Sequence, residues 1–439
     1  MTPRSLLTTH LVISIAAALG GAACDRALPI GSIPGEFHPH HPDGSGGVFG
    51  SGGALGSGGV FASGGVFGSG GAAAPDGGFG TDGSCSDTNA ASDLRTIAVE
   101  PGWYHACALL SDRSVRCWGD NQLAELGAPA VTCGKNIVAG LSDVASVVSD
   151  YVYSCALDTV GVARCWGSNI YGQFGNGTTG ANQPPTVAFG GLAVQQLSLG
   201  EYHACALYAD GHVACAGAHA RTSDGSPDDQ HTPVAVPGLS NVIQVEAGST
   251  FTCALLGDHS VSCWGDAQIV DPCASNAAHP IDPTPVGVSN VVKISAGGSH
   301  ACALLVDGTV TCWGRNTYGQ LGTDAPASQT CDVPDHRPIV IPALAGVRDV
   351  SAGDSHTCAL MNDGTVRCWG YNQYGQLGDG TTVGHQAPAP VAGLVGVRQL
   401  ASGYMDTCAI LTDGRLDCWG ALNPFFSTEM SATPTPVVF

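Results

Sequence analysis

The sequence predicts an all-β fold that is built from seven repeated antiparallel units. The 439 residues include 63 glycines and only 12% charged residues, a composition typical of many short strands joined by tight turns. From Cys107 onward, two cysteines ten positions apart recur seven times, and successive pairs begin 48, 50, 48, 49, 56 and 50 residues apart. This period is typical of propeller blades and related arrays, and no segment of the region has a convincing helical period.

Residues 1–23 have the features of an export signal. Arg4 precedes an apolar run that is too short to span a bilayer, and small residues follow up to Ala23. The stretch LGGAAC resembles a bacterial lipobox with Cys24 as the lipidated residue, although Gly21 stands where leucine is usual. We therefore expect a lipid-anchored exported protein, with ordinary cleavage after Ala23 as the alternative.

Residues 24–93 form a predicted linker between this signal and the repeats. The hexapeptide SGGVFG and its variants recur along this segment, and Gly/Ser-rich tracts behave as flexible coils. The recurring Val-Phe pairs could instead mediate self-association. The predicted organisation is a signal peptide over 1–23, a lipidated flexible linker over 24–93 and a repeat domain over 94–439.

The ten-residue spacing follows from hairpin geometry, as the repeat HACALLVDGTVTCWG illustrates. The three-residue loop 306–308 would be a type I turn closed by a residue in the left-handed region, which glycine adopts most easily. Counting outward from this loop pairs Cys302 with Cys312 at a non-hydrogen-bonded position, where strands lie close enough for a disulfide. Glycine holds the same loop position in every repeat except two, which have Arg113 and His259.

We therefore predict one disulfide in each repeat, because exported chains meet oxidising conditions and the spacing matches no usual zinc motif. The predicted pairs are Cys107–Cys117, Cys155–Cys165, Cys205–Cys215, Cys253–Cys263, Cys302–Cys312, Cys358–Cys368 and Cys408–Cys418. The alternative is buried free thiols packed as small apolar residues. Four further cysteines allow three connectivities. Pairing Cys85 with Cys133 and Cys273 with Cys331 is favoured because each pair would join neighbouring repeats.

Other positions recur around each hairpin. Glycine stands five residues before the first cysteine in six repeats, all seven continue Cys-Ala-Leu or Cys-Ala-Ile, and Trp-Gly follows the second cysteine in six. Alternating small and large apolar residues suit the faces of small, radially stacked sheets. The element Asn-x-Tyr-Gly-Gln-Leu-Gly is legible at 316–322, 372–378 and 169–175, and loosely at 121–127.

Because of these recurring elements, residues from about 95 to 439 resemble the repeats of the regulator of chromosome condensation family. The resemblance implies a seven-bladed β-propeller. It also implies a ring closed by both termini, with one blade completed from 434–439 and 94–102. The paired cysteines depart from the pattern of the family's nuclear members, and the third, fourth and seventh repeats lack the Asn-Tyr-Gly-Gln element.

Charge and motif content argue against several functions. The formal net charge of -21 would repel a phosphate backbone, so no nucleic acid partner is expected. The motifs HExxH and GxSxG and the P-loop are not found, and neither a cofactor nor a metal site is predicted. The Asp-rich loop 224–229 does not match the spacing of a known calcium-binding loop and is interpreted as a solvated turn. We therefore expect no enzyme, and nucleotide exchange is not carried over from the family.

The candidate binding site lies at two variable positions between the shared glycine and a histidine position. In order these positions hold Trp103-Tyr104, Tyr151-Val152, Glu201-Tyr202, Ser249-Thr250, Gly298-Ser299, Asp354-Ser355 and Tyr404-Met405. The aromatic residues fall in repeats 7, 1, 2 and 3, which ring closure makes one arc. Aromatic anchors beside acidic residues are typical of protein-binding or sugar-binding faces. The predicted site comprises Trp103, Tyr104, Tyr151, Glu201, Tyr202, Asp354 and Tyr404. The alternative is that these rings pack between blades.

The histidine position itself is expected to be structural. It holds His105, His203, His300 and His356 in four repeats. A residue that recurs in separate blades is more typical of a hydrogen bond to a turn than of catalysis.

Together these features predict a non-enzymatic, protein-binding propeller displayed at the bacterial cell envelope or surface. The protein would contact the membrane only through its lipid, or would be secreted if Cys24 is not lipidated. The alternatives are a module that binds cell-wall or surface glycan and, less favoured, a lyase or hydrolase built from scattered loops.

Overall fold

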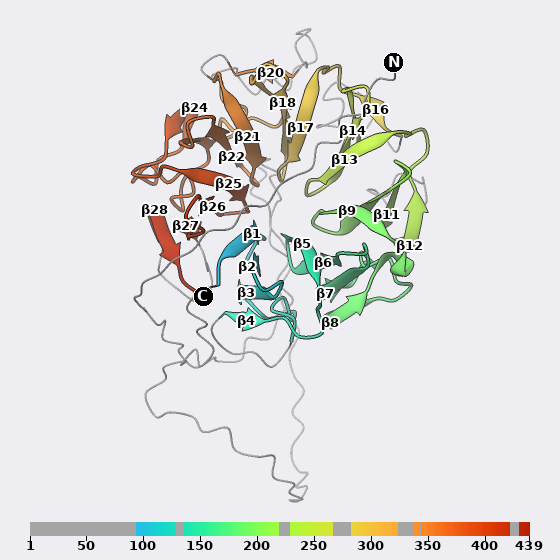
Figure 1. The fold of residues 1–439 in the computed structure, drawn as a ribbon. Coiled ribbons are helices and arrows are strands. Elements are labelled where there is room, and N and C mark those ends of the chain that lie inside the picture. Colours follow the sequence, from blue (N-terminus) through green and yellow to red (C-terminus); the bar gives the residue numbers. More distant parts are fainter. Residues whose placement is uncertain are drawn as a thin grey trace, which may run out of the picture. The chain divides into compact units, whose positions relative to one another are not determined.

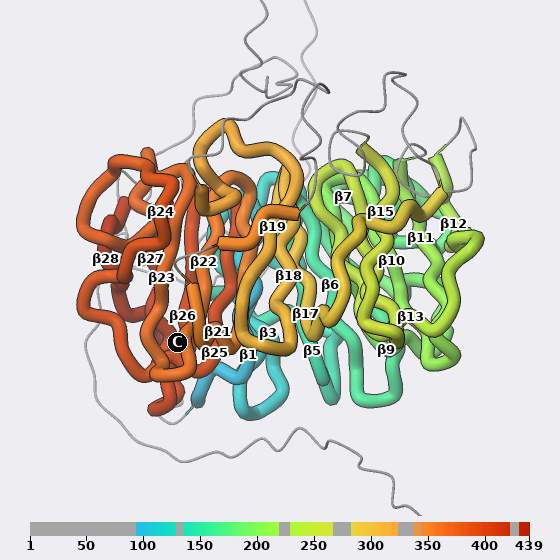
Figure 2. Tube along the Cα trace, turned by 90° about the horizontal axis from the view of Figure 1, so that it is seen from above, coloured from blue at the N-terminus to red at the C-terminus, as the bar shows by residue number. Residues whose placement is uncertain are grey.

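The structure is a computed structural model that describes residues 94–128, 135–218, 229–266, 282–323, 338–341, 344–421 and 430–439. These residues form a ring of seven four-stranded antiparallel sheets, the blades of a β-propeller (Figure 1). An edge-on view shows the blades side by side around the ring (Figure 2). The predicted all-β, seven-bladed fold is confirmed. Cys24, Cys85, Cys133, Cys273 and Cys331 lie outside the described residues, and so do their predicted lipidation and pairings.

Each blade runs outward from the axis in chain order, so that β1–β4 make blade 1 and β25–β28 make blade 7. The innermost strands are β1 (Thr96–Pro101), β5 (Val144–Asp150), β9 (Val194–Leu199), β13 (Val242–Ala247), β17 (Val291–Ala296), β21 (Val347–Ala352) and β25 (Val397–Ser402). The second strands are β2 (His105–Leu110), β6 (Tyr153–Asp158), β10 (His203–Tyr208), β14 (Phe251–Leu256), β18 (His300–Leu305), β22 (His356–Met361) and β26 (Asp406–Leu411).

The outermost strands vary more in length than the inner ones. The third strands are β3 (Val115–Gly119), β7 (Ala163–Asn169), β11 (Val213–Gly217), β15 (Val261–Gly265), β19 (Val310–Gly314), β23 (Val366–Gly370) and β27 (Leu416–Ala421). The outermost are β4 (Asn136–Ile137), β8 (Gly180–Val187), β12 (Gln230–Ala235), β16 (Thr284–Pro285), β20 (Ile339–Val340), β24 (His385–Pro390) and β28 (Met430–Val437). One 3-10 turn, η1 (Phe189–Gly191), follows β8. Within the described ranges, no helix is long and apolar enough to cross a membrane.

The hairpin between the second and third strands has the predicted register. In blade 5, Cys302 lies opposite Cys312 and Leu304 opposite Val310. The loop glycine, Gly308, has a φ of 78°, and Arg113 and His259 adopt similar values of 69° and 67° at the same loop position. All seven predicted disulfides form, with paired Cα atoms 4.0 or 4.1 Å apart.

The core lies between blades rather than within one blade. Cys107 and Cys117 of blade 1 pack in one cluster with Val147 and Trp166 of blade 2, and comparable clusters occupy the other blade interfaces. The disulfide side of one sheet therefore faces the tryptophan side of the next. Alternation along each strand assigns the two faces, which is why the Cys-Ala-Leu and Trp-Gly elements recur in fixed register.

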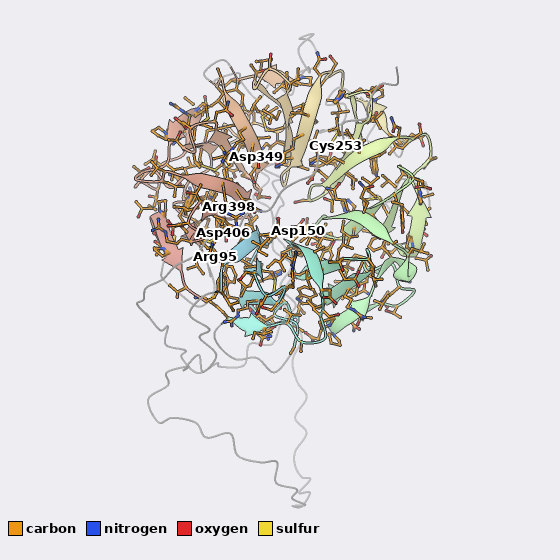
Figure 3. The ribbon with its side chains drawn as sticks, in the orientation of Figure 1. Arg95, Asp150, Cys253, Asp349, Arg398 and Asp406 are labelled. Atoms are coloured by element: carbon orange, nitrogen blue, oxygen red, sulfur yellow. A yellow bond between two sulfur atoms is a disulfide. The ribbon has the colours of Figure 1, made fainter. Side chains whose placement is uncertain are left out.

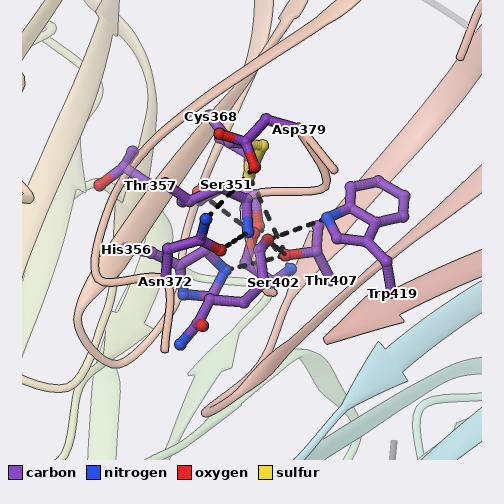
Figure 4. The surroundings of a disulfide bond; sticks show 12 residues. Ser351, His356, Thr357, Cys368, Asn372, Asp379, Ser402, Thr407 and Trp419 are labelled. Atoms are coloured by element: carbon purple, nitrogen blue, oxygen red, sulfur yellow. Dashed lines mark hydrogen bonds between the residues drawn. A yellow bond between two sulfur atoms is a disulfide. The ribbon is translucent and has the colours of Figure 1, made fainter. Parts of the chain in front are cut away.

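The recurring histidines join neighbouring blades. His356 Nε2 lies 2.8 Å from Thr407 Oγ1 of the next blade, and this hydroxyl donates to Gln376 O at 3.0 Å (Figure 4). Equivalent histidine contacts join His105 to Ser154, His203 to Thr252 and His300 to Thr357. The predicted structural role therefore fits the contacts, but the partner is a hydroxyl of the adjacent blade rather than a turn.

The expectation of one blade shared by the two termini is wrong. Strands β1–β4 and β25–β28 each form a complete, continuous blade. Both ends still take part in closing the ring, because the terminal blades pack on each other. Val99 joins the core of blade 7, Arg398 donates to Thr96 O at 2.6 Å, and the Phe439 ring lies 5.4 Å from that of Trp118.

Candidate functional site

The variable positions gather at one end of the propeller, where each first strand turns into the second. The residue after each Trp-Gly lies beside them, as shown by the bonds from Asp120 N to Tyr104 O at 2.7 Å and from Tyr371 N to Ser355 O at 2.9 Å. Loops from the first to second strands and from the third to fourth strands therefore meet at this end. The opposite end carries the turns of the cysteine hairpins.

Aromatic rings from neighbouring blades touch one another here in an unbroken series. Trp103 stacks on Tyr404 with ring centroids 4.0 Å apart and meets Tyr151 edge-on at 4.3 Å. Tyr151 in turn contacts Tyr202 at 5.4 Å. The structure thus brings the predicted aromatic residues of blades 7, 1, 2 and 3 into one arc, across the seam where the ring closes.

Sequence reasoning missed further tyrosines of the same surface. Tyr171 contacts Tyr202 at 4.8 Å, Tyr318 contacts Tyr371 at 4.7 Å, and Tyr371 lies 6.1 Å from Tyr374. Three of the four belong to the Asn-x-Tyr-Gly-Gln element, which recurs between repeats and therefore lay outside the variable positions that define the predicted site. The aromatic rim is defined here as Trp103, Tyr104, Tyr151, Tyr171, Tyr202, Tyr318, Tyr371, Tyr374 and Tyr404.

The rim has a buried layer and an accessible layer. Trp103 and Tyr151 are only 8% and 9% exposed, so they support the other rings. Tyr104, Tyr202 and Tyr404 are partly exposed. Two rings of the predicted arc therefore pack between blades, and three present area to solvent.

Carboxylates stand between these rings. Glu201 is buried beside Tyr202, Asp120 is buried beneath Tyr104, and Asp150 and Asp354 are partly buried nearby. Burial, assisted by the charges of Glu201 and Asp354, raises the pKa of Asp150 to about 7. Burial, the neighbouring Tyr151 and the charge of Asp120 raise the pKa of Tyr104 to about 12. The rim is thus both aromatic and acidic.

Asp150 occupies a position where the other six blades have glycine. These glycines let adjacent loops approach closely: a Cβ atom added to Gly200 would lie 2.4 Å from Gly248 O, and one added to Gly248 would lie 2.3 Å from Gly297 O. In blade 2 the backbone departs from the repeat, and Tyr151 has an unfavourable φ of 21°. Such local strain is concentrated at functional positions in proteins, which favours this rim as the site.

The axis of the ring encloses a cavity of about 490 Å³, lined by the innermost strands. Asp150 and Asp349 lie toward the centre of the ring (Figure 3). Lys293 Nζ forms an ion pair with Asp349. Burial and the charge of Glu246 raise the pKa of Glu100 to about 8, against the opposing charge of Lys293.

Most polar groups of the axis hold the blades together. Gln196 donates to Val245 O and accepts from Val245 N–H, both at 3.0 Å, and Gln244 forms the same pair of bonds with Ile294 at 2.9 Å. Each side-chain amide thereby replaces a backbone pairing partner between neighbouring innermost strands. The axis is accordingly a structural element, and the rim at its end is the better candidate for recognition. Among the described residues, no group of three or more His, Cys, Asp or Glu side chains is placed to hold a metal ion.

Segments of the chain match the family described as regulator of chromosome condensation (RCC1) repeat. One set of matches covers 96–123, 242–268, 291–320 and 347–376, and another covers 165–207, 307–360 and 363–410. Together these segments include part of every blade. The predicted resemblance of the repeats is thereby confirmed.

Several known proteins are similar over most of the ring. The ultraviolet-B receptor UVR8 of Arabidopsis thaliana is 25% identical over 335 residues, which are 69% of this chain and 71% of that protein. The structure of Prp20p from Saccharomyces cerevisiae matches with a TM-score of 0.63 and 21% identity, over 70% of this chain and 80% of the other. Human WBSCR16 matches with a TM-score of 0.61 and 23% identity, over 71% and 85%. The two structural matches establish a common fold.

Proposed function

This chain is a seven-bladed propeller with RCC1 repeats around its ring, and we propose that it is a non-enzymatic module that binds another protein through the aromatic rim. The observation that carries the proposal is the unbroken ring contact from Tyr404 through Trp103 and Tyr151 to Tyr202. Partly exposed tyrosines on a rigid support offer large contact area at low entropic cost, and such residues dominate many protein interfaces.

A related observation favours proteins as ligands. Prp20p, which shares the propeller fold, is described by its binding to Gsp1p and histones. A propeller of this architecture can therefore present a protein-binding face, although the residues of that face have to be identified separately in each chain.

The test is retention of proteins from envelope and secreted extracts on the immobilised full chain. Tyr104→Ala/Tyr202→Ala removes accessible rim rings, and Val160→Ala/Val306→Ala is the matched control because both valines are more than 70% exposed in hairpin loops at the other end. We expect the rim variant alone to lose a retained protein, with unchanged near-UV circular dichroism. Retention by a correctly folded rim variant would contradict the proposal.

The same rim supports a second candidate, the binding of cell-wall or surface glycan. Stacked and edge-on aromatic rings such as Trp103 and Tyr404 can also bind the apolar faces of sugars. Release of the retained material by soluble wall fragments, with no protein lost in the rim variant, would select this candidate. A lyase or hydrolase is the least favoured function.

We further propose that the propeller is exported and displayed at the bacterial envelope by a lipid on Cys24, with residues 24–93 as the tether. Labelling cells with an alkyne fatty acid tests this proposal. The wild-type chain should take up the label and Cys24→Ser should not. Equal labelling of the two chains, or release of unlabelled wild type into the medium, would contradict anchoring at Cys24.

A further inference from the structure

We propose that the aromatic rim recognises a cationic segment of its partner, with arginine or lysine side chains placed over tyrosine rings and paired with rim carboxylates. The inference rests on the proposed function, because it names the chemistry of the partner at that same rim. It is carried by the distribution of charge among the rings.

Four acidic side chains lie beside the rim rings. Asp120 of blade 1, Asp150 of blade 2, Glu201 of blade 3 and Asp354 of blade 6 surround the part of the rim centred on Trp103. Arg315 of blade 5 also lies at this end of the ring, in the blade next to that of Asp354, whereas Asp120, Asp150 and Glu201 belong to blades 1 to 3. A ligand that settles over Trp103, Tyr104 and Tyr404 therefore meets several negative charges.

The rim carboxylates also affect the neighbouring tyrosines. Burial, together with the charge of Asp354, raises the pKa of Tyr404, and burial with the hydrogen bond and charge of Glu201 raises that of Tyr202. A cation brought against these groups would stabilise the carboxylates. An anion would add to the repulsion.

Aromatic faces add a second attraction for cations. A guanidinium or ammonium group over a tyrosine ring is attracted by the negative face of the ring, and more strongly when water is displaced. The partly exposed rings of Tyr104, Tyr202 and Tyr404 stand next to the carboxylates, so that one basic side chain can use both. The chain's net charge of -21 would also steer basic partners toward it. A neutral glycan would gain nothing from this charge.

The test is fluorescence anisotropy of the full chain with labelled peptides of alternating glycine and arginine, or of glycine and glutamate, at low and physiological salt. Glu201→Gln/Asp354→Asn removes two rim charges while keeping polar side chains. Asp307→Asn/Asp413→Asn removes two charges at the opposite end, where asparagine still accepts the turn hydrogen bonds that each aspartate receives. Tyr104→Leu/Tyr404→Leu removes ring faces and keeps apolar volume.

We expect the arginine peptide to bind and the glutamate peptide not to bind. The rim-charge variant should weaken binding about tenfold and the ring variant about fivefold, which corresponds to roughly 0.5 to 0.7 kcal/mol for each of the two contacts that a variant loses. The opposite-end variant should change the dissociation constant less than twofold. Equal weakening by both charge variants would overturn the inference, because it would indicate attraction to an acidic chain in general. Absence of binding by the arginine peptide would overturn it as well.

The outcome separates this inference from the proposed function. If the rim variant Tyr104→Ala/Tyr202→Ala loses a retained protein that the arginine peptide does not displace, the function stands and the cationic ligand is wrong. If the rim variant keeps that protein, the proposed function itself fails. Displacement by the arginine peptide and not by the glutamate peptide supports both.

Discussion

At the residue scale, two positions in adjacent blades change together. Where the second strand begins with histidine, the residue before the first cysteine of the next blade carries a hydroxyl. These pairs are His105 with Ser154, His203 with Thr252, His300 with Thr357 and His356 with Thr407. Where the histidine is replaced by Tyr153, Phe251 or Asp406, the corresponding residues are Ala204, Ala301 and Ala106. The sequence contains this rule, but only the contact between blades reveals it.

Thr407→Val should lower the free energy of unfolding by about 1 to 3 kcal/mol. The substitution removes a hydroxyl that contacts His356 Nε2 at 2.8 Å and donates to Gln376 O at 3.0 Å, and it leaves both groups buried without this partner. Urea denaturation measures the change. Thr412→Val, at an exposed position of the same blade, is the control and should cost much less; equal losses would show that the hydroxyl bridge does not stabilise the interface between blades 6 and 7.

Glu125→Gln should stabilise the protein at pH 8 and leave it nearly unchanged at pH 4.5. Glu125 stands where the other three loops have glutamine, and its carboxylate accepts from Leu123 N as Gln173 accepts from Tyr171 N. Burial and the charge of Asp120 raise its pKa from 4.5 to about 7. A raised carboxyl pKa contributes stability at low pH that is lost as pH rises through the folded value.

Urea denaturation at the two pH values measures this effect, with an expected gain on the order of 2 kcal/mol at pH 8. An identical difference between wild type and Glu125→Gln at both pH values would contradict an origin in ionisation.

At the element scale, the hairpins were predictable and the loops were not. Turn chemistry and strand alternation act over ten residues, so the register of Cys302 with Cys312 follows from local sequence alone. The loop tyrosines Tyr171 and Tyr318 were missed because their ring contacts are made with the neighbouring blade, which a repeat motif does not show. The same loops support tryptophans of the next blade: the bonds are Trp166 Nε1 to Glu125 O, Trp369 Nε1 to Gln320 O and Trp419 Nε1 to Gln376 O.

Removing one disulfide should weaken the propeller without changing its fold. Cys302→Ala/Cys312→Ala removes a disulfide between residues ten positions apart. The unfolded chain then loses this constraint, which lowers the free energy of unfolding by about 3 kcal/mol. The strand pairing on both sides of the hairpin keeps its register. Chemical denaturation checks the magnitude and far-UV circular dichroism checks the fold; unfolding of the whole chain in buffer would contradict this account.

At the scale of the whole molecule, the repeat period determined the number of blades but not where each blade begins. A periodic sequence has no inherent starting point, so the same motifs allow a blade shared by both termini or seven continuous blades. Packing decides between them. Strand β28 pairs with β27 of its own blade, and the seam is closed by contacts such as Phe439 with Trp118 and Arg398 with Thr96 O.

The melting temperature should be highest at about pH 4.5 and should fall on both sides. Burial lowers the pKa of His105, His300 and His356 to about 3, so unfolding takes up protons and stability drops as pH falls below 6.5. Burial raises the pKa of carboxyl groups such as Glu100 and Asp150, so stability drops as pH rises above about 4.

The raised carboxyls outnumber the lowered histidines, so the carboxyls dominate from about pH 4.5 to about pH 8 and the histidines dominate at lower pH. Differential scanning calorimetry across this range measures the profile. A melting temperature that rises steadily from pH 5 to 8 would contradict the assigned directions.

The most direct test of recognition by the aromatic rim is hydroxyl-radical footprinting of the full chain with and without its retained protein partner. We expect protection to be concentrated on partly exposed rim tyrosines such as Tyr104, Tyr202 and Tyr371, while the hairpin-turn residues Val160 and Val306 keep their reactivity. Protection of the hairpin turns with an unchanged rim would place the binding face at the opposite end of the propeller and contradict recognition by the aromatic rim.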